Sequence, residues 1–516
     1  MEAVALSAVP DLFHSSFEKF YSLTDRLRSP ETRAMNLSDL EKLVETESRE
    51  LKRRLLQDHL NSRGSGDVGG SVKGADQAER NHKRDRSRGL TTLFGEVRVD
   101  RTGYSAHGES SLFPKDAILN LPNDSFSHGI RKAIAIEAAR GSFDEATSAL
   151  QRMTGIEVGK RQAEELSRKA AVDFYAFYEN GCSDEAVAAV KALPLQILSM
   201  DGKGIVMRHE DLKEATRIKA EEAEHKLKKR VSRGEKRNAK RMATVAAIYS
   251  IDEFIRTPEQ VAGELAPVRA LGMAQRPRPV AKRVWASIEK EQEAVIDDLM
   301  NAALTRDPDK RKRWVCLVDG DRKQLKRLRR AAKKHEIKMT LVLDIIHVIE
   351  YLWKAGRVFH EEASPETEKW VSERLLECLR GNASHVAAGM RRSATLREIP
   401  EAIRKPVDTC AGYLLKNAPY LRYHEYLAAG FPIATGVIEG ACRHLIKDRM
   451  DLTGARWSLQ GAEAILKLRS LRSSGDFEEY WDFHEKQEYQ RNHKSQYAKP
   501  SVLTKLKLAV VKTSSP

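Results

Sequence analysis

The sequence contains few cysteines and no long apolar run. Only five of its 516 residues are cysteine, and no two of them form a Cys-x-x-Cys pair. This spacing predicts neither a disulfide framework nor a zinc ribbon. No apolar run reaches the length of a membrane span, and the opening "MEAVALSAVPDLFHSSFEKF" lacks the charged, then apolar, layout of a signal peptide. The expectation is a soluble protein of a reduced, bacterial-type cytoplasm.

Charge is the most informative bulk property. The chain has 89 Lys and Arg residues against 74 Asp and Glu residues, a net charge of +15. Such a surplus favours a polyanionic partner, and nucleic acid is the commonest one. Basic residues concentrate at 226–241 and 322–334. These stretches suggest phosphate contacts, although a solvated charged helix or loop would have the same composition.

The first 185 residues divide into three predicted parts. Residues 1–60 form a helical segment, in which Ser38 and Glu41 have the spacing of a capping box. Residues 61–90 are rich in Gly, Ser and mixed charge, which predicts a flexible linker. Residues 91–185 begin with an alternating hairpin pattern and continue into a DNA-binding region.

The DNA-binding prediction for that region comes from its helix, glycine turn and second helix at 142–170. These are helix-turn-helix proportions, in which the start of the second helix enters a major groove. Lys160, Arg161 and Gln162 occupy that start. An ordinary helical hairpin has the same pattern, so both interpretations stay open here.

Strand and helix patterns alternate from Leu193 onward. The apolar run "LPLQILSMD" predicts a strand that ends at Asp201, and further strands are expected at 242–251, 313–321 and 338–344, with a helix near 283–304. Alternation of this kind predicts an α/β sheet with ligands at strand ends. Residues 354–430 then look entirely helical, and their interleaved tyrosines suit either base stacking or helix packing.

Three acids stand out against this background. Asp201 and Asp319 each follow an apolar strand and precede glycine, and Glu439 opens a later basic helix. Carboxylates are hard oxygen ligands for Mg²⁺ or Mn²⁺, and two such ions can assist an in-line displacement at phosphorus. A hairpin turn remains the simpler interpretation of a lone Asp-Gly. Asp321 competes with Asp319, which we prefer because it directly ends the strand.

The stretches "SMDGKG", "VDGDR" and "GVIEGACRHLIKDRMDLTGARWS" together resemble the DDE transposases, and most closely the ISKra type of insertion sequence. The resemblance covers roughly residues 90–480. It implies an α/β, RNase H-like catalytic core at 190–353 and 431–485, interrupted by an all-helical insertion at 354–430. A mainly helical DNA-binding region would precede the core, and a basic tail would follow at 486–516.

Residue roles follow from the same resemblance. It implies that Asp201, Asp319 and Glu439 are catalytic and hold two Mg²⁺ or Mn²⁺ ions. Asp344 and His347 match a C/D-x-x-H signature of Mutator-like transposases, with support of the metal site or DNA contact as the implied role. Asp344 suits a plain helix N-cap equally well. The remaining expected DNA contacts are basic: Arg322, Lys323, Arg443, His444, Lys447 and Arg449.

The segment "GYSAHGES" departs from the pattern, because relatives often carry a cysteine pair there and this chain has none. A zinc-stabilised N-terminal module is therefore not expected. The predicted function is DNA cleavage at element ends and strand transfer to double-stranded target DNA by a homo-oligomer assembled on DNA. Two alternatives remain: an RNase H-like nuclease without strand transfer, and a DNA-binding regulator that has lost the chemistry.

Overall fold

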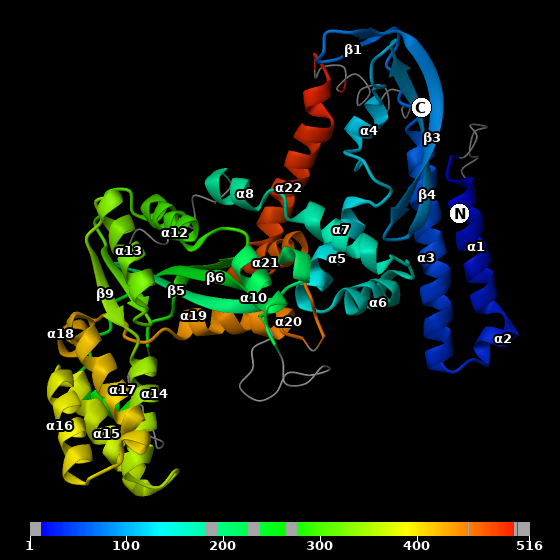
Figure 1. The fold of residues 1–516 in the computed structure, drawn as a ribbon. Helices are drawn as coiled ribbons and strands as arrows, with labels where there is room; N and C mark the ends of the chain where they lie inside the picture. Colours follow the sequence, from blue (N-terminus) through cyan, green and yellow to red (C-terminus); the bar gives the residue numbers. More distant parts are fainter. Residues whose placement is uncertain are drawn as a thin grey trace. The chain divides into compact units, whose positions relative to one another are not determined.

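The chain forms two compact units (Figure 1). One unit combines residues 1–181 with residues 478–516, and the other contains residues 182–477. The computed structural model describes residues 12–180, 193–224, 238–264, 276–452, 454–499 and 503. Within those ranges, none of the helices has the length and apolar character needed to cross a membrane.

The first unit begins with a helical hairpin. Its helices are α1 (His14–Arg28), α2 (Pro30–Arg33) and α3 (Leu37–Ser62). The predicted capping box of Ser38 and Glu41 is replaced by a cap two residues earlier, since the Asn36 side chain accepts a hydrogen bond from the Asp39 amide at 3.0 Å. Asparagine is as good an N-cap as serine, and Asn36 precedes Ser38 in the chain, so the helix already begins at Leu37.

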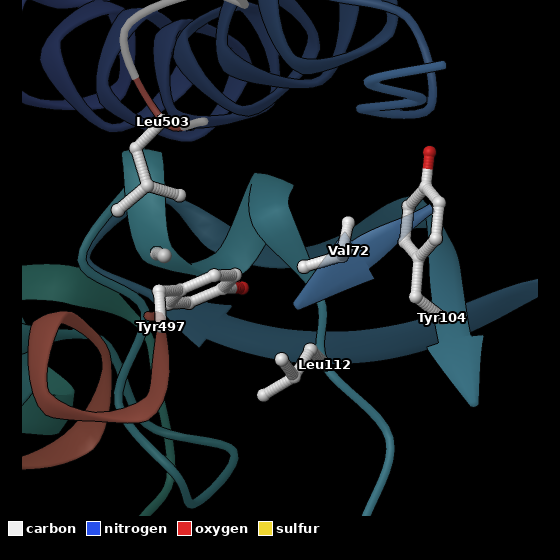
Figure 2. Packing of buried hydrophobic residues seen from close by; sticks show 6 residues of the cluster. Val72, Tyr104, Leu112, Tyr497 and Leu503 are labelled. Carbon is white, nitrogen blue, oxygen red and sulfur yellow. The ribbon is translucent and has the colours of Figure 1, made fainter. Parts of the chain in front are cut away.

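The predicted flexible linker at 61–90 is ordered structure, which corrects that expectation. It contains β1 (Val72–Lys73) and β2 (Glu79–Arg80), and β3 (His82–Thr92) begins inside it and pairs with β4 (Gly95–Ser105). Val72 is fully buried with Tyr104 and with Tyr497 from the far end of the sequence (Figure 2). Composition missed this because the few apolar residues of the stretch pack against residues outside it, some of them hundreds of positions away.

Helices α4 (Pro114–Ile118), α5 (His128–Arg140), α6 (Phe143–Thr154), α7 (Lys160–Ala170) and α8 (Phe174–Asn180) follow. A capping box of Ser142 and Glu145 starts α6, and Gly155 with φ of 73° ends it. Helices α5, α6 and α7 share an apolar cluster of Ile130, Ile134, Leu150, Val158, Ala163 and Leu166. The predicted helix, turn and helix are therefore present, packed on a third helix.

The last helix, α22 (Phe477–Asn492), and the short η4 (Lys494–Gln496) belong mainly to the first unit. The Tyr480 hydroxyl donates to the Ala170 carbonyl at 2.6 Å, and Asp173 pairs with His484 and Arg491. This differs from the expected core boundary at 485 and basic tail from 486. The many polar residues of α22 led to the prediction of a tail. Its few buried residues, however, pack against the first unit.

The second unit contains a five-stranded sheet, so the α/β class is confirmed. Its strands are β5 (Leu195–Val206), β6 (Lys240–Ile251), β7 (Val280–Ser287), β8 (Arg313–Val318) and β9 (Met339–Leu343), in the order β7-β6-β5-β8-β9. Strands β5, β6 and β7 pair antiparallel, whereas β8 and β9 run parallel to β5. The central strand is therefore β5, the first in the chain.

Strand β7 corrects the helix expected near 283–304, which begins only at Gln292. Trp285 and Ala286 of β7 are buried against β6, and Ser287 bonds to the buried Glu463. The apolar residues of this short stretch fit both the spacing of a helix and the alternation of a strand. The stretch forms a strand because it pairs with β6. The helix that follows, α12 (Gln292–Arg306), packs on β6.

Helices connect and cover the remaining parts of this unit. They are η1 (His209–Asp211), α10 (Glu214–Glu221), α11 (Pro258–Glu264), α13 (Arg322–Lys334), α14 (Ile345–Phe359), α15 (Pro365–Leu379), α16 (Ala383–Leu396), α17 (Glu401–Asn417), η2 (Ala418–Tyr420), α18 (Tyr423–Ala428), α19 (Gly436–Ala441), the π-helical segment η3 (Cys442–Lys447), α20 (Asp448–Met450) and α21 (Leu459–Ser474). Helices α15 to α18 occupy the stretch for which an insertion was expected. Tyr423 there is buried and donates to the Leu343 carbonyl, which favours packing over base stacking.

Candidate active site at the end of the parallel strands

Asp201 lies within the central strand, which corrects the expectation that the strand ends there. Strand β5 pairs with β8 only as far as Ser199, but its pairing with β6 continues through Asp201 to Val206. The Asp-Gly pair is therefore not a hairpin turn. Asp201 sits on the part of β5 that extends beyond its parallel neighbour, and its side chain is about one-third exposed at 32%.

Asp319 directly follows β8, and the two nearby aspartates have different tasks. The Asp319 Oδ1 atom accepts the Asp321 amide at 2.9 Å, while Asp321 caps α13 by accepting the Gln324 amide at 2.7 Å. Between them, Gly320 has φ of 91°, and an added Cβ would lie 3.1 Å from the Asn417 side chain. The glycine therefore permits the sharp turn that leaves Asp319 at the strand end.

Glu439 and Cys442 come from the chain that crosses beside β5. Helix α19 carries the exposed Glu439 and packs against β5 and β6. The next segment is π-helical, and its buried Cys442 donates from Sγ to the Asp201 Oδ2 atom at 3.1 Å. Cys442 was not predicted from the sequence as part of the site. The only indication in the sequence is that it follows Glu439 by three residues.

Asp344 is fully buried and serves as more than a helix cap. It accepts hydrogen bonds from the Ile346 amide at 3.1 Å, as the N-cap of α14, and from the Thr435 amide at 3.2 Å. Its other oxygen accepts from the Thr435 hydroxyl and lies 3.0 Å from the Nδ1 atom of His347. The aspartate thus ties α14 to the segment that leads into α19.

The acids share one electrostatic environment. Burial raises the pKa of Asp319, and the charge of Asp201 raises it further, while His347 opposes the shift. Burial also raises the pKa of Glu439, with added contributions from Asp344 and Asp201. The hydrogen bond to Asp344 raises the pKa of His347. A carboxylate whose ionised form is disfavoured by burial and by a neighbouring acid is stabilised by a bound cation.

The carboxylate oxygens of Asp201, Asp319 and Glu439 are suitable ligands for Mg²⁺ or Mn²⁺, but the three side chains lie too far apart to share one ion. Within the described ranges, no three His, Cys, Asp or Glu side chains lie close enough together to hold a metal ion. Uncompensated carboxylates repel one another, so closer approach requires a counter-charge. Asp201, Asp319 and Glu439 therefore lie in one region of the second unit, but they do not form a preassembled metal site.

The expected DNA-contacting residues divide by exposure. Arg322, Lys323, Arg443, His444 and Lys447 are exposed on the second unit. Arg449 is only 3% exposed, and its guanidinium stacks on the Trp457 ring at 4.7 Å. Burial corrects the expected phosphate contact of Arg449 and assigns it to packing.

In the first unit, the three residues that open α7 also differ. The Arg161 side chain is 92% exposed and lies 3.6 Å from Glu165, whereas Lys160 pairs more closely with Asp144, at 2.6 Å. Gln162 is used internally, because its side-chain oxygen accepts the Gly159 amide at 3.0 Å and closes the helix start. Of the three, Arg161 is the side chain most available to a ligand.

Comparison with known proteins finds a distant structural neighbour. No family model matches the sequence, and no curated protein matches it. Among solved structures, the chain is similar to one described as "Drosophila P element transposase strand transfer complex", at 9% identity and a TM-score of 0.21, over 76% of this chain and 93% of that one. A TM-score this low carries no argument about fold or function.

The raised pKa of Asp319 predicts a stability effect in metal-free buffer. Because burial disfavours its ionised form, Asp319→Asn is expected to raise the Tm at neutral pH. The difference should shrink as the pH falls through the raised pKa and vanish below the ordinary pKa of about 3.9, where the wild-type carboxyl is protonated in both states. Thermal unfolding across pH measures this, with exposed Asp309→Asn as the control; equal Tm values throughout would contradict it.

Proposed function

We propose that this protein is a metal-dependent DNA transposase with an RNase H-like catalytic unit. The observation that carries the proposal is the placement of three acids that are more than a hundred residues apart in sequence. Strands β5 and β8 pair with Ser199 opposite Leu317, which brings Asp201 level with Asp319, and Glu439 is on α19, which packs against β5. Their placement agrees with the resemblance: the first acid is on the central strand, the second follows the fourth strand of the sheet, and the third is on a later helix.

The residues suit the proposed chemistry. Asp201, Asp319 and Glu439 would hold one or two Mg²⁺ or Mn²⁺ ions, which supply charge for in-line displacement at a phosphodiester. Cys442 holds one oxygen of Asp201, and Asp321 holds one oxygen of Asp319 through its amide. The Asp201 Oδ1 atom also accepts the Gly202 amide at 2.6 Å, so both oxygens of Asp201 are held in place, whereas the Oδ2 atom of Asp319 can turn toward a ligand.

In the proposed reaction, exposed basic residues at the start of α13 and on η3 bind the DNA backbone and hold the scissile phosphate beside the acids. Water would attack at the element end, and the freed 3′-hydroxyl would then attack target DNA. Neither step needs a covalent enzyme intermediate, so the role of the chain is positioning and charge stabilisation. A nuclease would carry out the first step alone.

Two assays test the proposal and separate it from its alternatives. Purified protein is incubated with the DNA that flanks its gene, with and without Mg²⁺, and products are resolved for cleavage and for joining to a target plasmid. Cleavage followed by joining supports a transposase, and cleavage alone supports the nuclease. Binding without metal-dependent cleavage would leave the regulator and reject the proposal.

DNA affinity is expected to fall steeply with salt. Helix α13 exposes basic residues along one side. The other basic segment of the sequence, at 226–241, lies mostly outside the described residues. Each phosphate neutralised lowers log affinity by roughly 0.9 per log unit of salt. Fluorescence anisotropy on duplex DNA over a salt series measures the slope; a flat response would contradict a nucleic-acid partner.

Arg161→Ala is expected to reduce preference for the element ends over scrambled DNA, with a smaller effect on bulk affinity. Arg161 is exposed at the start of α7, where base contacts are made in helix-turn-helix proteins. The full chain is the proper sample, since α22 completes the unit. Competition binding measures the preference, and Arg152→Ala, on the preceding helix α6, is the matched control. An unchanged ratio would leave the helical insertion as the sequence reader.

A further inference from the structure

The contact between α1 and α3 combines polar pairs with the buried Leu23, and further apolar side chains of both helices face outward. Between the two helices, Asp58 accepts from the Ser16 amide at 3.0 Å and from the Ser16 hydroxyl at 2.5 Å, and Lys19 pairs with Glu47. Six large apolar side chains of the hairpin are exposed: Phe17 49%, Phe20 48%, Tyr21 63%, Leu37 70%, Val44 37% and Leu55 45%. Exposed apolar groups gathered in one place indicate an interaction surface.

The spacing of these residues forms two parallel stripes. Phe17, Phe20 and Tyr21 are separated by three and four positions, so they share one side of α1. Leu37, Val44 and Leu55 are separated by whole numbers of turns, so they share one side of α3. The ion pairs show that the helices run antiparallel, and each stripe lies about a quarter turn from their line of contact, on the same side of the hairpin.

The charge of this region excludes DNA as the occupant. Residues 14–62 contain nine acidic and nine basic side chains, so their net charge is zero, whereas the chain carries +15. A neutral, aromatic face has no electrostatic attraction for phosphates. Balanced charges of both signs beside an apolar stripe are self-complementary, which is what an isologous contact between identical copies requires.

We propose that the outer face of the α1–α3 hairpin is a dimer interface, and that it packs against the same face of a second copy as a four-helix bundle. The two stripes supply the apolar seam of the bundle. The flanking charges, such as Asp25 and Lys52, form its polar rim. This dimer forms without DNA and does not depend on the proposed catalytic activity.

The experiment measures mass in solution by light scattering on the full chain, without DNA and in high salt. Wild-type protein is expected at twice the chain mass of 58.2 kDa, and Phe20→Glu with Val44→Glu at the single mass. The matched control, Leu396→Glu with Ile403→Glu, replaces two apolar residues of the other unit that are more exposed than Phe20 and Val44, and it should stay dimeric. A monomeric wild-type protein, or a dimeric Phe20/Val44 variant, overturns the proposal.

A second variant guards against loss of folding. Tyr21→Cys adds a thiol on the outer face, while the described native cysteines, Cys316, Cys378, Cys410 and Cys442, are all buried. A short bis-maleimide should link two Tyr21→Cys copies into a covalent dimer, and Ser22→Cys, one position further round the helix, should link less. Equal linking of both variants, or none, would also contradict the interface.

Discussion

Asp319→Asn, Asp201→Asn and Glu439→Gln are each expected to abolish Mg²⁺-dependent DNA cleavage while leaving DNA affinity within a few-fold of wild type. An amide keeps the size of the carboxyl group but loses the charge that a divalent cation requires. Loss of metal stabilisation amounts to several kcal/mol of transition-state energy, which corresponds to a rate decrease of about a thousandfold or more. Single-turnover cleavage of end-labelled DNA measures the loss.

Asp321→Ala is the matched control for this set. Asp321 lies two residues from Asp319, but its side chain caps α13. Loss of that cap should cost about 1 kcal/mol of stability and leave most of the cleavage rate. If Asp321→Ala instead abolishes cleavage and Asp319→Asn does not, the catalytic role passes to Asp321. Near-normal cleavage by any one of the three acid variants would remove that acid from the proposed site.

The acids could be located from sequence because each lies at a change of local pattern. The apolar runs before Asp201 and Asp319 are strand-like on any interpretation, and a carboxylate at their end is conspicuous. What the sequence could not show is that β5 continues past Asp201 along β6, because only the neighbouring strand satisfies the backbone of the polar residues that follow. Register depends on the partner, and the partner is distant in sequence.

The same reason explains the other corrections. The 61–90 stretch looked like a linker because its buried residues, such as Val72, are few and complete a cluster with Tyr497. Arg449 looked like a phosphate ligand because charge alone does not reveal a ring stacked beneath it. The contact of Cys442 with Asp201 joins residues 241 positions apart, and no local pattern encodes it. In each case a tertiary contact decides, whether its partner is eight residues away, as Trp457 is from Arg449, or hundreds.

Asp344→Ala is expected to destabilise the second unit by about 3 kcal/mol or more, and to reduce cleavage through that loss. Asp344 is fully buried and holds the start of α14, the Thr435 amide and hydroxyl, and His347. Removing one partner of a buried charged network leaves the others unpaired, which is the costly case. Thermal and denaturant unfolding measure the change.

His347→Ala separates a structural role from a functional one. The His347 side chain is 38% exposed, so its removal should cost far less stability than the loss of Asp344. Its ring carries a pKa raised by Asp344, and its charge is felt by both Asp319 and Glu439. If His347 assists the acids, His347→Ala lowers cleavage and shifts its pH profile while the Tm stays near that of wild type. If cleavage and its pH profile are unchanged, the Asp344 network serves only to join α14 to the segment before Glu439.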